Sequence, residues 1–139
     1  MEEYKTLFIC ACASDDKKTF SGGHFGDAEV YLLYRVSDEG SEFIEEIENT
    51  SIDEQTHGDP KKAKSVTSLL KKKSVQVLVS RSFGPNIVRI RAHFVAVLVR
   101  KKGIEEGVAL VRENLEAIER EWRKDGSERK HLILSDKRL

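Results

Sequence analysis

Two cysteines, Cys10 and Cys12, are the softest candidate metal ligands in this chain of 139 residues. They lie in an apolar, β-prone segment, so their side chains should share one face of a strand. Thiolates are the ligands that iron–sulfur and molybdenum–sulfur clusters take. A free cysteine in a core strand is also often a small buried hydrophobe. The second interpretation is favoured for Cys10, and both stay open for Cys12, which is nearer the carboxyl end where ligands approach α/β sheets.

Two histidines lie in predicted loops, where an imidazole can ligate a metal that arrives after folding. His24 follows the flexible pair Gly22-Gly23, with Phe25 beside it to exclude water and Gly26 to allow a tight turn. His57 precedes a predicted helix and could reach the same end of the sheet. A structural turn beside His24, and simple surface exposure of His57, are the alternatives.

A third candidate is the segment Ser80–Asn86, which connects a predicted buried strand to a predicted helix. Backbone N–H groups at a helix amino terminus favour anions, and Arg81 adds a forked guanidinium. Ser82 and Gly84 belong to this anion cradle. A sulfide-rich cluster, a phosphate or a carboxylate would each suit it, and a plain strand-to-helix connection is the alternative.

The charges are strongly segregated although the formal net charge is zero. Residues 36–60 include nine acidic side chains and no basic one, whereas residues 61–102 include twelve Lys or Arg and no acid. Such asymmetry indicates an anionic partner for the basic half. The alternative is that the two blocks pair with each other in the fold.

These residues must be positioned by a fold whose elements the periodicity predicts. The predicted strands are 4–13, 28–36, 42–48, 75–79 and 94–99; predicted helices begin near residues 59, 84 and 104, the last running to 122. Turn chemistry at Asp38-Glu39-Gly40 predicts an antiparallel hairpin. The order βββαβαβα predicts an α/β domain with a five-stranded mixed sheet and helices on its faces.

Length predicts one domain, assigned to residues 1–123, followed by a polar tail at 124–139. An apolar patch in the tail, Leu132–Leu134, either docks as an edge strand or stays mobile. The acidic start is unlike a secretory signal, and the apolar runs are far shorter than a membrane span. We therefore expect a cytoplasmic protein with no membrane partner.

Three loops in this order resemble those of the dinitrogenase iron–molybdenum cofactor-binding family. They are Gly23-His24-Phe25-Gly26-Asp27-Ala28, His57-Gly58 and Ser80-Arg81-Ser82-Phe83-Gly84-Pro85-Asn86, and the likeness extends roughly over residues 5–118. The resemblance implies a ribonuclease H-like mixed sheet. It also implies a monomer or weak homodimer that binds the iron–molybdenum cofactor, its precursor or another iron–sulfur or molybdenum–sulfur cluster, with cofactor-assembly proteins as partners. The family's first strand commonly ends in small apolar or hydroxyl residues, where this chain has Cys10 and Cys12.

The predicted cofactor-binding residues are Cys12, His24, Phe25, Gly26, His57, Arg81, Ser82 and Gly84; the predicted metal ligands are Cys10, Cys12, His24 and His57. A nuclease of this fold type would need carboxylates on its central strands to hold two metal ions. The first strand and residues 61–102 have none, so we expect no enzyme. A nucleic-acid-binding or protein-interaction module using residues 61–102 is the alternative, although Phe83 and Phe94 alone could stack on bases there.

Overall fold

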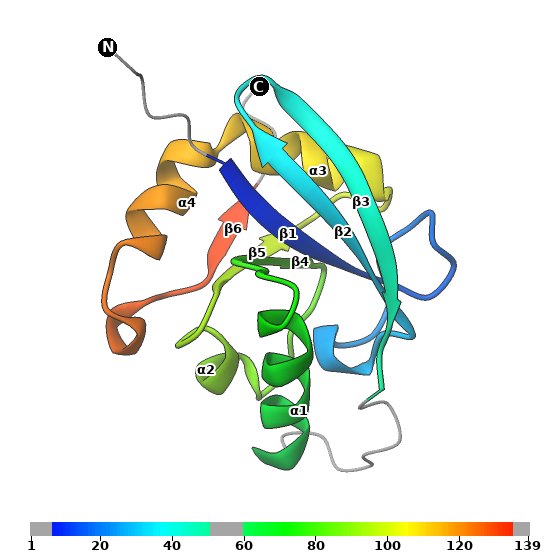
Figure 1. The fold of residues 1–139 in the computed structure, drawn as a ribbon, viewed down its shortest axis with the longest axis vertical. Helices are drawn as coiled ribbons and strands as arrows, with labels where there is room; N and C mark the ends of the chain where they lie inside the picture. Colours follow the sequence, from blue (N-terminus) through cyan, green and yellow to red (C-terminus); the bar gives the residue numbers. More distant parts are fainter. Residues whose placement is uncertain (1–6, 51–59, 135–139) are drawn as a thin grey trace.

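The computed structural model describes residues 7–50 and 60–134 (Figure 1). Its strands are β1 Leu7–Ser14, β2 Val30–Ser37, β3 Gly40–Glu48, β4 Val77–Ser80, β5 Val95–Val99 and β6 Leu132–Leu134. Its α-helices are α1 Pro60–Lys71, α2 Ile87–Ile90, α3 Ile104–Glu113 and α4 Leu115–Trp122. Two short 3-10 turns, η1 Phe25–Asp27 and η2 Gly126–Glu128, complete the described elements.

All the strands join one mixed sheet in the order β3-β2-β1-β4-β5-β6. The β1–β2 and β2–β3 pairs are antiparallel, whereas β1–β4, β4–β5 and β5–β6 are parallel. The predicted α/β class and mixed sheet are confirmed. The predicted count of five strands is wrong, because Leu132–Leu134 pairs with Val97–Val99 as a sixth, edge strand. The ribonuclease H-like assignment stays a prediction.

Alternation along β1 divides the core into two halves, one on each face of the sheet. Phe8, Cys10 and Cys12 point toward α3 and α4, while Ala11 and Ala13 point toward α1, α2 and η1. The helices cover the two faces accordingly (Figure 1). Since each face has its own buried cluster, the face on which a β1 side chain lies decides which helices it can meet.

The long helix predicted for residues 104–122 is interrupted at Asn114, which separates α3 from α4. Asn114 has φ −125° and ψ 27°, and its side-chain amide donates to the Leu110 carbonyl at 2.8 Å. Such back-bonding competes with the regular helix ladder and bends helices. The apolar stripe survives the break, since Val111, Leu115 and Ile118 are buried. No described helix is long and apolar enough to cross a membrane.

The chain diverges at the carboxyl ends of β1 and β4, which lie side by side because the two strands are parallel neighbours. From β1 the chain continues to β2 on one side, and from β4 it continues through α2 to β5 on the other. Ligands of open α/β sheets bind at such a topological switch point. The loops that follow Ser14 and Ser80 therefore occupy the position where a ligand site is expected.

Candidate functional site

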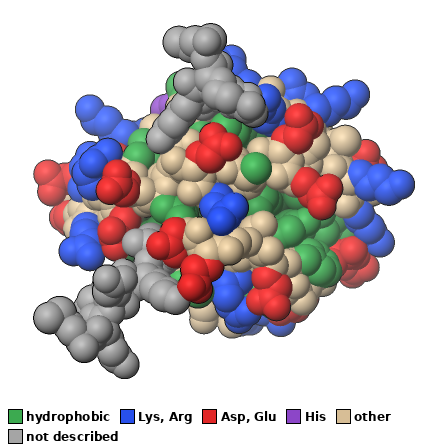
Figure 2. Space-filling model, turned by 90° about the horizontal axis from the view of Figure 1, so that it is seen from above, with side chains coloured by type: hydrophobic (Ala, Val, Ile, Leu, Met, Phe, Trp, Pro, Cys, Tyr) green, Lys and Arg blue, Asp and Glu red, His purple; other side chains and the backbone are tan. Residues whose placement is uncertain are grey.

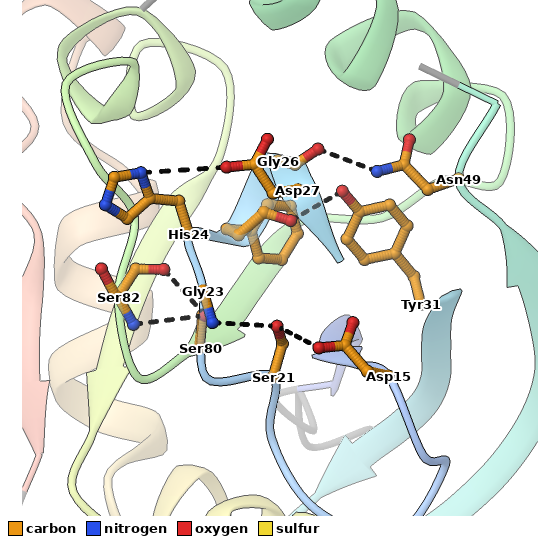
Figure 3. Close-up of polar contacts among 11 residues, drawn as sticks. Asp15, Ser21, Gly23, His24, Gly26, Asp27, Tyr31, Asn49, Ser80 and Ser82 are labelled. Atoms are coloured by element: carbon orange, nitrogen blue, oxygen red, sulfur yellow. Dashed lines mark hydrogen bonds and ion pairs between the residues drawn. The ribbon is translucent and has the colours of Figure 1, made fainter. Parts of the chain in front are cut away.

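The loops after β1 and β4 contact each other directly at this switch point (Figure 3). The Phe25 N–H donates to the Ser82 carbonyl at 2.8 Å. The Phe25 ring is fully buried and stacks on Tyr31 at 4.7 Å and on Phe83 at 5.4 Å between ring centroids. Two of the three predicted loops are thus joined by one buried aromatic stack and a backbone hydrogen bond.

His24 lies against Gly84, so the contact between the two loops includes the candidate metal ligand. Gly84 has φ +72°, a left-handed conformation that favours glycine. A Cβ at this position would lie 2.7 Å from His24 Cγ and would collide with Nδ1. Glycine is therefore required here twice, once by the backbone and once by the imidazole ring.

Asp27 lies near the His24 ring in the same turn. Its Oδ2 lies 3.9 Å from His24 Nδ1, and the side chains of His24 and Asp27 are 39% and 26% exposed. A carboxylate at one ring nitrogen is the usual outer partner of a metal-ligating histidine. With Asp27 on the Nδ1 side, a metal at His24 would bind through Nε2.

Two buried residues that the sequence did not reveal hold the turn in place. The Tyr31 hydroxyl donates to the Phe25 carbonyl at 2.8 Å, and the Asn49 amide donates to the Gly26 and Ala28 carbonyls, each at 2.8 Å. Burial, and to a lesser extent the Asp27 carboxylate, raises the pKa of Tyr31, so its hydroxyl remains a donor. A buried tyrosine needs a partner, but nothing in the sequence indicates which, and Asn49 simply follows β3.

The carboxylates of the preceding loop are engaged in holding the loop itself. Asp16 accepts hydrogen bonds from the Thr19 and Lys18 backbone N–H groups and from the Thr19 hydroxyl, and these bonds lower the pKa of Asp16. Asp15 accepts from the Ser21 hydroxyl at 2.8 Å and from the Glu29 N–H at 3.0 Å. Their oxygens therefore serve as turn caps.

The predicted anion cradle after β4 is only partly formed. The Ser80 hydroxyl donates to the Ser82 carbonyl at 2.9 Å, which tightens the turn, and Arg81 is exposed at its tip. The predicted helix start at Gly84-Pro85 is wrong: α2 begins at Ile87 and has four residues. One turn of helix has a weak dipole, so Arg81 and the loop backbone remain as the anion-attracting groups.

The structure does not bring Cys10 and Cys12 to His24. Both thiols are fully buried on the face of the sheet that α3 and α4 cover, whereas Phe25 anchors the His24 loop on the opposite face. Burial raises the pKa of both thiols, and the neighbouring Cys10 adds to the effect on Cys12. A protonated thiol sealed in a core is a poor ligand. His57 lies outside the described residues.

The two phenylalanines of the basic half are not available to stack on nucleic-acid bases. Phe83 is 4% exposed and Phe94 is fully buried, so neither is available to bases. The two charge blocks meet at Lys73 and Glu45, whose Nζ and Oε1 lie 3.2 Å apart. At the end of the molecule seen in Figure 2, acidic and basic side chains are interleaved.

Residues 7–114 match the dinitrogenase iron-molybdenum cofactor family, and the chain belongs to that family. The match includes both loops of the site. No curated protein matches the sequence significantly. The fold is similar to a crystal structure from Methanocaldococcus jannaschii whose protein has the provisional name dinitrogenase, with TM-score 0.56 and 17% identity over 78% of this chain and 90% of that one. A likeness at this identity shows a shared fold alone.

Proposed function

We propose that this protein is a small cytosolic carrier that binds an anionic iron–sulfur or molybdenum-containing cluster at the switch point. The iron–molybdenum cofactor, its precursor, or another iron–sulfur or molybdenum–sulfur cluster is the cargo. The observation that supports the proposal most is the contact between the loops that follow β1 and β4. There the His24 ring lies against Gly84 at the carboxyl ends of the two strands. Family membership supports the same class of ligand.

The donor set suits a prebuilt cluster better than a bare metal ion. Within residues 7–50 and 60–134, no three His, Cys, Asp or Glu side chains are grouped so that they could hold an ion. A bare Zn²⁺ or similar ion needs three or four protein ligands. A cluster brings its own sulfides, so it needs fewer ligands from the protein than a bare ion does. His24 would supply the ligand and Arg81 the charge.

The site is better suited to carrying a metal cluster than to catalysing a reaction. The strands β1, β4 and β5 have no carboxylate, and Asp15 and Asp16 are held by loop hydrogen bonds. The site therefore offers a ligand, a glycine platform and a guanidinium, and the Asp27 carboxylate beside His24 lies 3.9 Å from Nδ1, beyond the hydrogen-bond distance that an acid–base pair needs. His57 is a second candidate ligand, and cofactor-assembly proteins are the partners we expect to deliver or receive the cluster.

The test is anaerobic reconstitution of the full chain with iron, sulfide and molybdate, followed by metal analysis and visible absorption. Wild-type protein should become coloured and retain metal through gel filtration, and His24→Ala should lose at least about tenfold in retained metal. His131→Ala is the matched control, because His131 is exposed outside the site, and it should load like wild type. Wild-type protein that stays colourless and metal-free would contradict the proposal for these cargoes.

A further inference from the structure

One face of α1 presents basic and hydroxyl side chains at helical spacing. These residues follow the pattern i, i+3, i+4, i+7 and i+8, and they are Lys64, Thr67, Ser68 and Lys71 of α1 and Lys72 in the turn after it. The opposite face buries Val66 and Leu70 in the core. The helix is therefore amphipathic in the ordinary sense, but its polar face has positive charge and no negative charge.

This face of α1 forms a groove with the segment that contains α2. Arg89 and His93 complete the lining, and the groove has a volume of about 650 Å³. That size is in the range of small-molecule sites. The described residues that line it include no acidic side chain. Lysine stems contribute apolar wall while their ammonium groups remain at the rim.

Two of the basic side chains in the groove contact neutral acceptors. The Lys71 ammonium lies 3.0 Å from His93 Nδ1, and Arg89 Nη1 donates to Asn86 Oδ1 at 2.9 Å. Burial, followed by the charges of Lys71 and Arg129, lowers the pKa of His93. By contrast, Lys73, next to the groove, pairs with Glu45 of β3. Lys64 and Lys72 have no acidic partner among the residues that the structure describes.

We propose that the groove between α1 and α2 binds a small oligophosphate, either inorganic or as the phosphate chain of a nucleotide. Lys64 and Lys71 are seven residues apart, which is about 10 Å along a helix, so the cations match a chain of phosphates better than a single one. Nucleic acid is the less suitable occupant because Phe83 and Phe94 are buried, which leaves His93 as the aromatic ring among the described lining residues. The groove shares no residue with the His24 site, so this proposal stands independently of cluster binding.

The experiment is isothermal titration calorimetry of the full chain with tripolyphosphate, ATP and a single-stranded dodecanucleotide at about 150 mM salt, where diffuse surface attraction is screened. The groove variant is Lys64→Gln/Lys71→Gln/Lys72→Gln. Its matched control, Lys18→Gln/Lys102→Gln/Lys130→Gln, removes the same charge from exposed lysines elsewhere. Circular dichroism verifies that both variants fold.

We expect tripolyphosphate or ATP to bind, the groove variant to raise Kd at least about tenfold, and the control to change Kd less than twofold. Amide NMR shifts in wild-type protein should move at residues 64–72 and 89–93 and stay unchanged at 22–27. Equal affinities would identify the phosphate chain as the whole ligand, and tighter ATP binding would identify a nucleotide. The proposal is overturned if neither phosphate ligand binds, if the two variants lose affinity equally, or if only the oligonucleotide binds.

Discussion

The β1 thiols and the His24 loop are two candidate ligand regions within one short stretch of sequence. The fold buries the first and leaves the second partly exposed. Cys10 and Cys12 are fully buried between β2 and β4 under α3 and α4. His24 keeps 39% of its side chain exposed at the carboxyl edge of the same sheet. The comparison shows that strand spacing decides which side chains share a face, but topology decides whether that face is accessible.

The largest expected effect is on the free energy of unfolding, and it tests whether the buried aromatic stack anchors the His24 loop. Phe25→Ala removes a fully buried ring that stacks on Tyr31 and Phe83. The free energy of unfolding should fall by about 3–5 kcal/mol. Urea denaturation measures it, with Phe43→Ala as the control because Phe43 is 52% exposed and should cost less than about 1 kcal/mol. Equal losses would mean that the aromatic stack does not anchor the loop.

Gly84→Ala tests the contact between the loops. It places a methyl group against the His24 ring and a side chain at φ +72°, so it should cost about 2–3 kcal/mol and also reduce metal retention. Gly22→Ala is the matched control, since a Cβ there meets nothing within 4 Å. Thermal unfolding and metal analysis measure both. If Gly84→Ala is as stable as Gly22→Ala and retains as much metal, Gly84 is needed neither for the contact between the loops nor for metal binding.

The thiols should behave as core residues with a characteristic pH dependence. Cys12→Ala should lower the free energy of unfolding by about 1–2 kcal/mol through the cavity that it leaves. Because burial raises the pKa of Cys10 and Cys12 in the folded state, their contribution is present below the unfolded thiol pKa of about 8.5 and is lost as the pH rises above it. Urea denaturation at pH 8 and pH 9.5 measures this loss.

In Cys10→Ala/Cys12→Ala, stability should depend less on pH over that interval than in wild type. The interval lies below the ordinary pKa of tyrosine, about 10, so Tyr31 contributes little to the difference. Identical pH dependence in the two proteins would show that the thiols ionise in the folded state, which a sealed core does not allow.

The smallest expected effect on stability is that of His24→Ala. The ring is partly exposed and packs on a glycine, so its removal should change the free energy of unfolding by less than about 0.5 kcal/mol. Urea denaturation beside wild type measures it. A loss above about 1.5 kcal/mol would give His24 a structural role in addition to the proposed binding role.

Sequence patterns predicted most of the fold because each depends on local periodicity. The turn at Asp38-Glu39-Gly40 indicated the β2–β3 hairpin, and the apolar runs indicated β1, β4 and β5. The break at Asn114 escaped prediction, since a side-chain hydrogen bond is not a periodic signal. For β6 the sequence left two alternatives open, an edge strand or a mobile segment, and the pairing with β5 shows the first.

The candidate site could be predicted only as separate loops. Loop position and the family-like motifs identified His24 and Gly84 as residues of interest, but their contact depends on how β1 and β4 align in the sheet. The hydrogen bonds from Tyr31 and Asn49 to the η1 turn are long-range and leave no motif. Cys10 and Cys12 were correctly expected to share a face, whereas the helices that cover that face could not be read from spacing.

The most direct measurement is the metal retained after anaerobic reconstitution by Cys10→Ala/Cys12→Ala and by His24→Ala, each normalised to wild type in the same experiment. The proposed site predicts that the cysteine variant retains close to the wild-type amount of metal, although it is less stable. His24→Ala should retain about one tenth of that amount or less, although it is nearly as stable as wild type. The reverse pattern, with metal lost from the cysteine variant and kept by His24→Ala, would contradict the account.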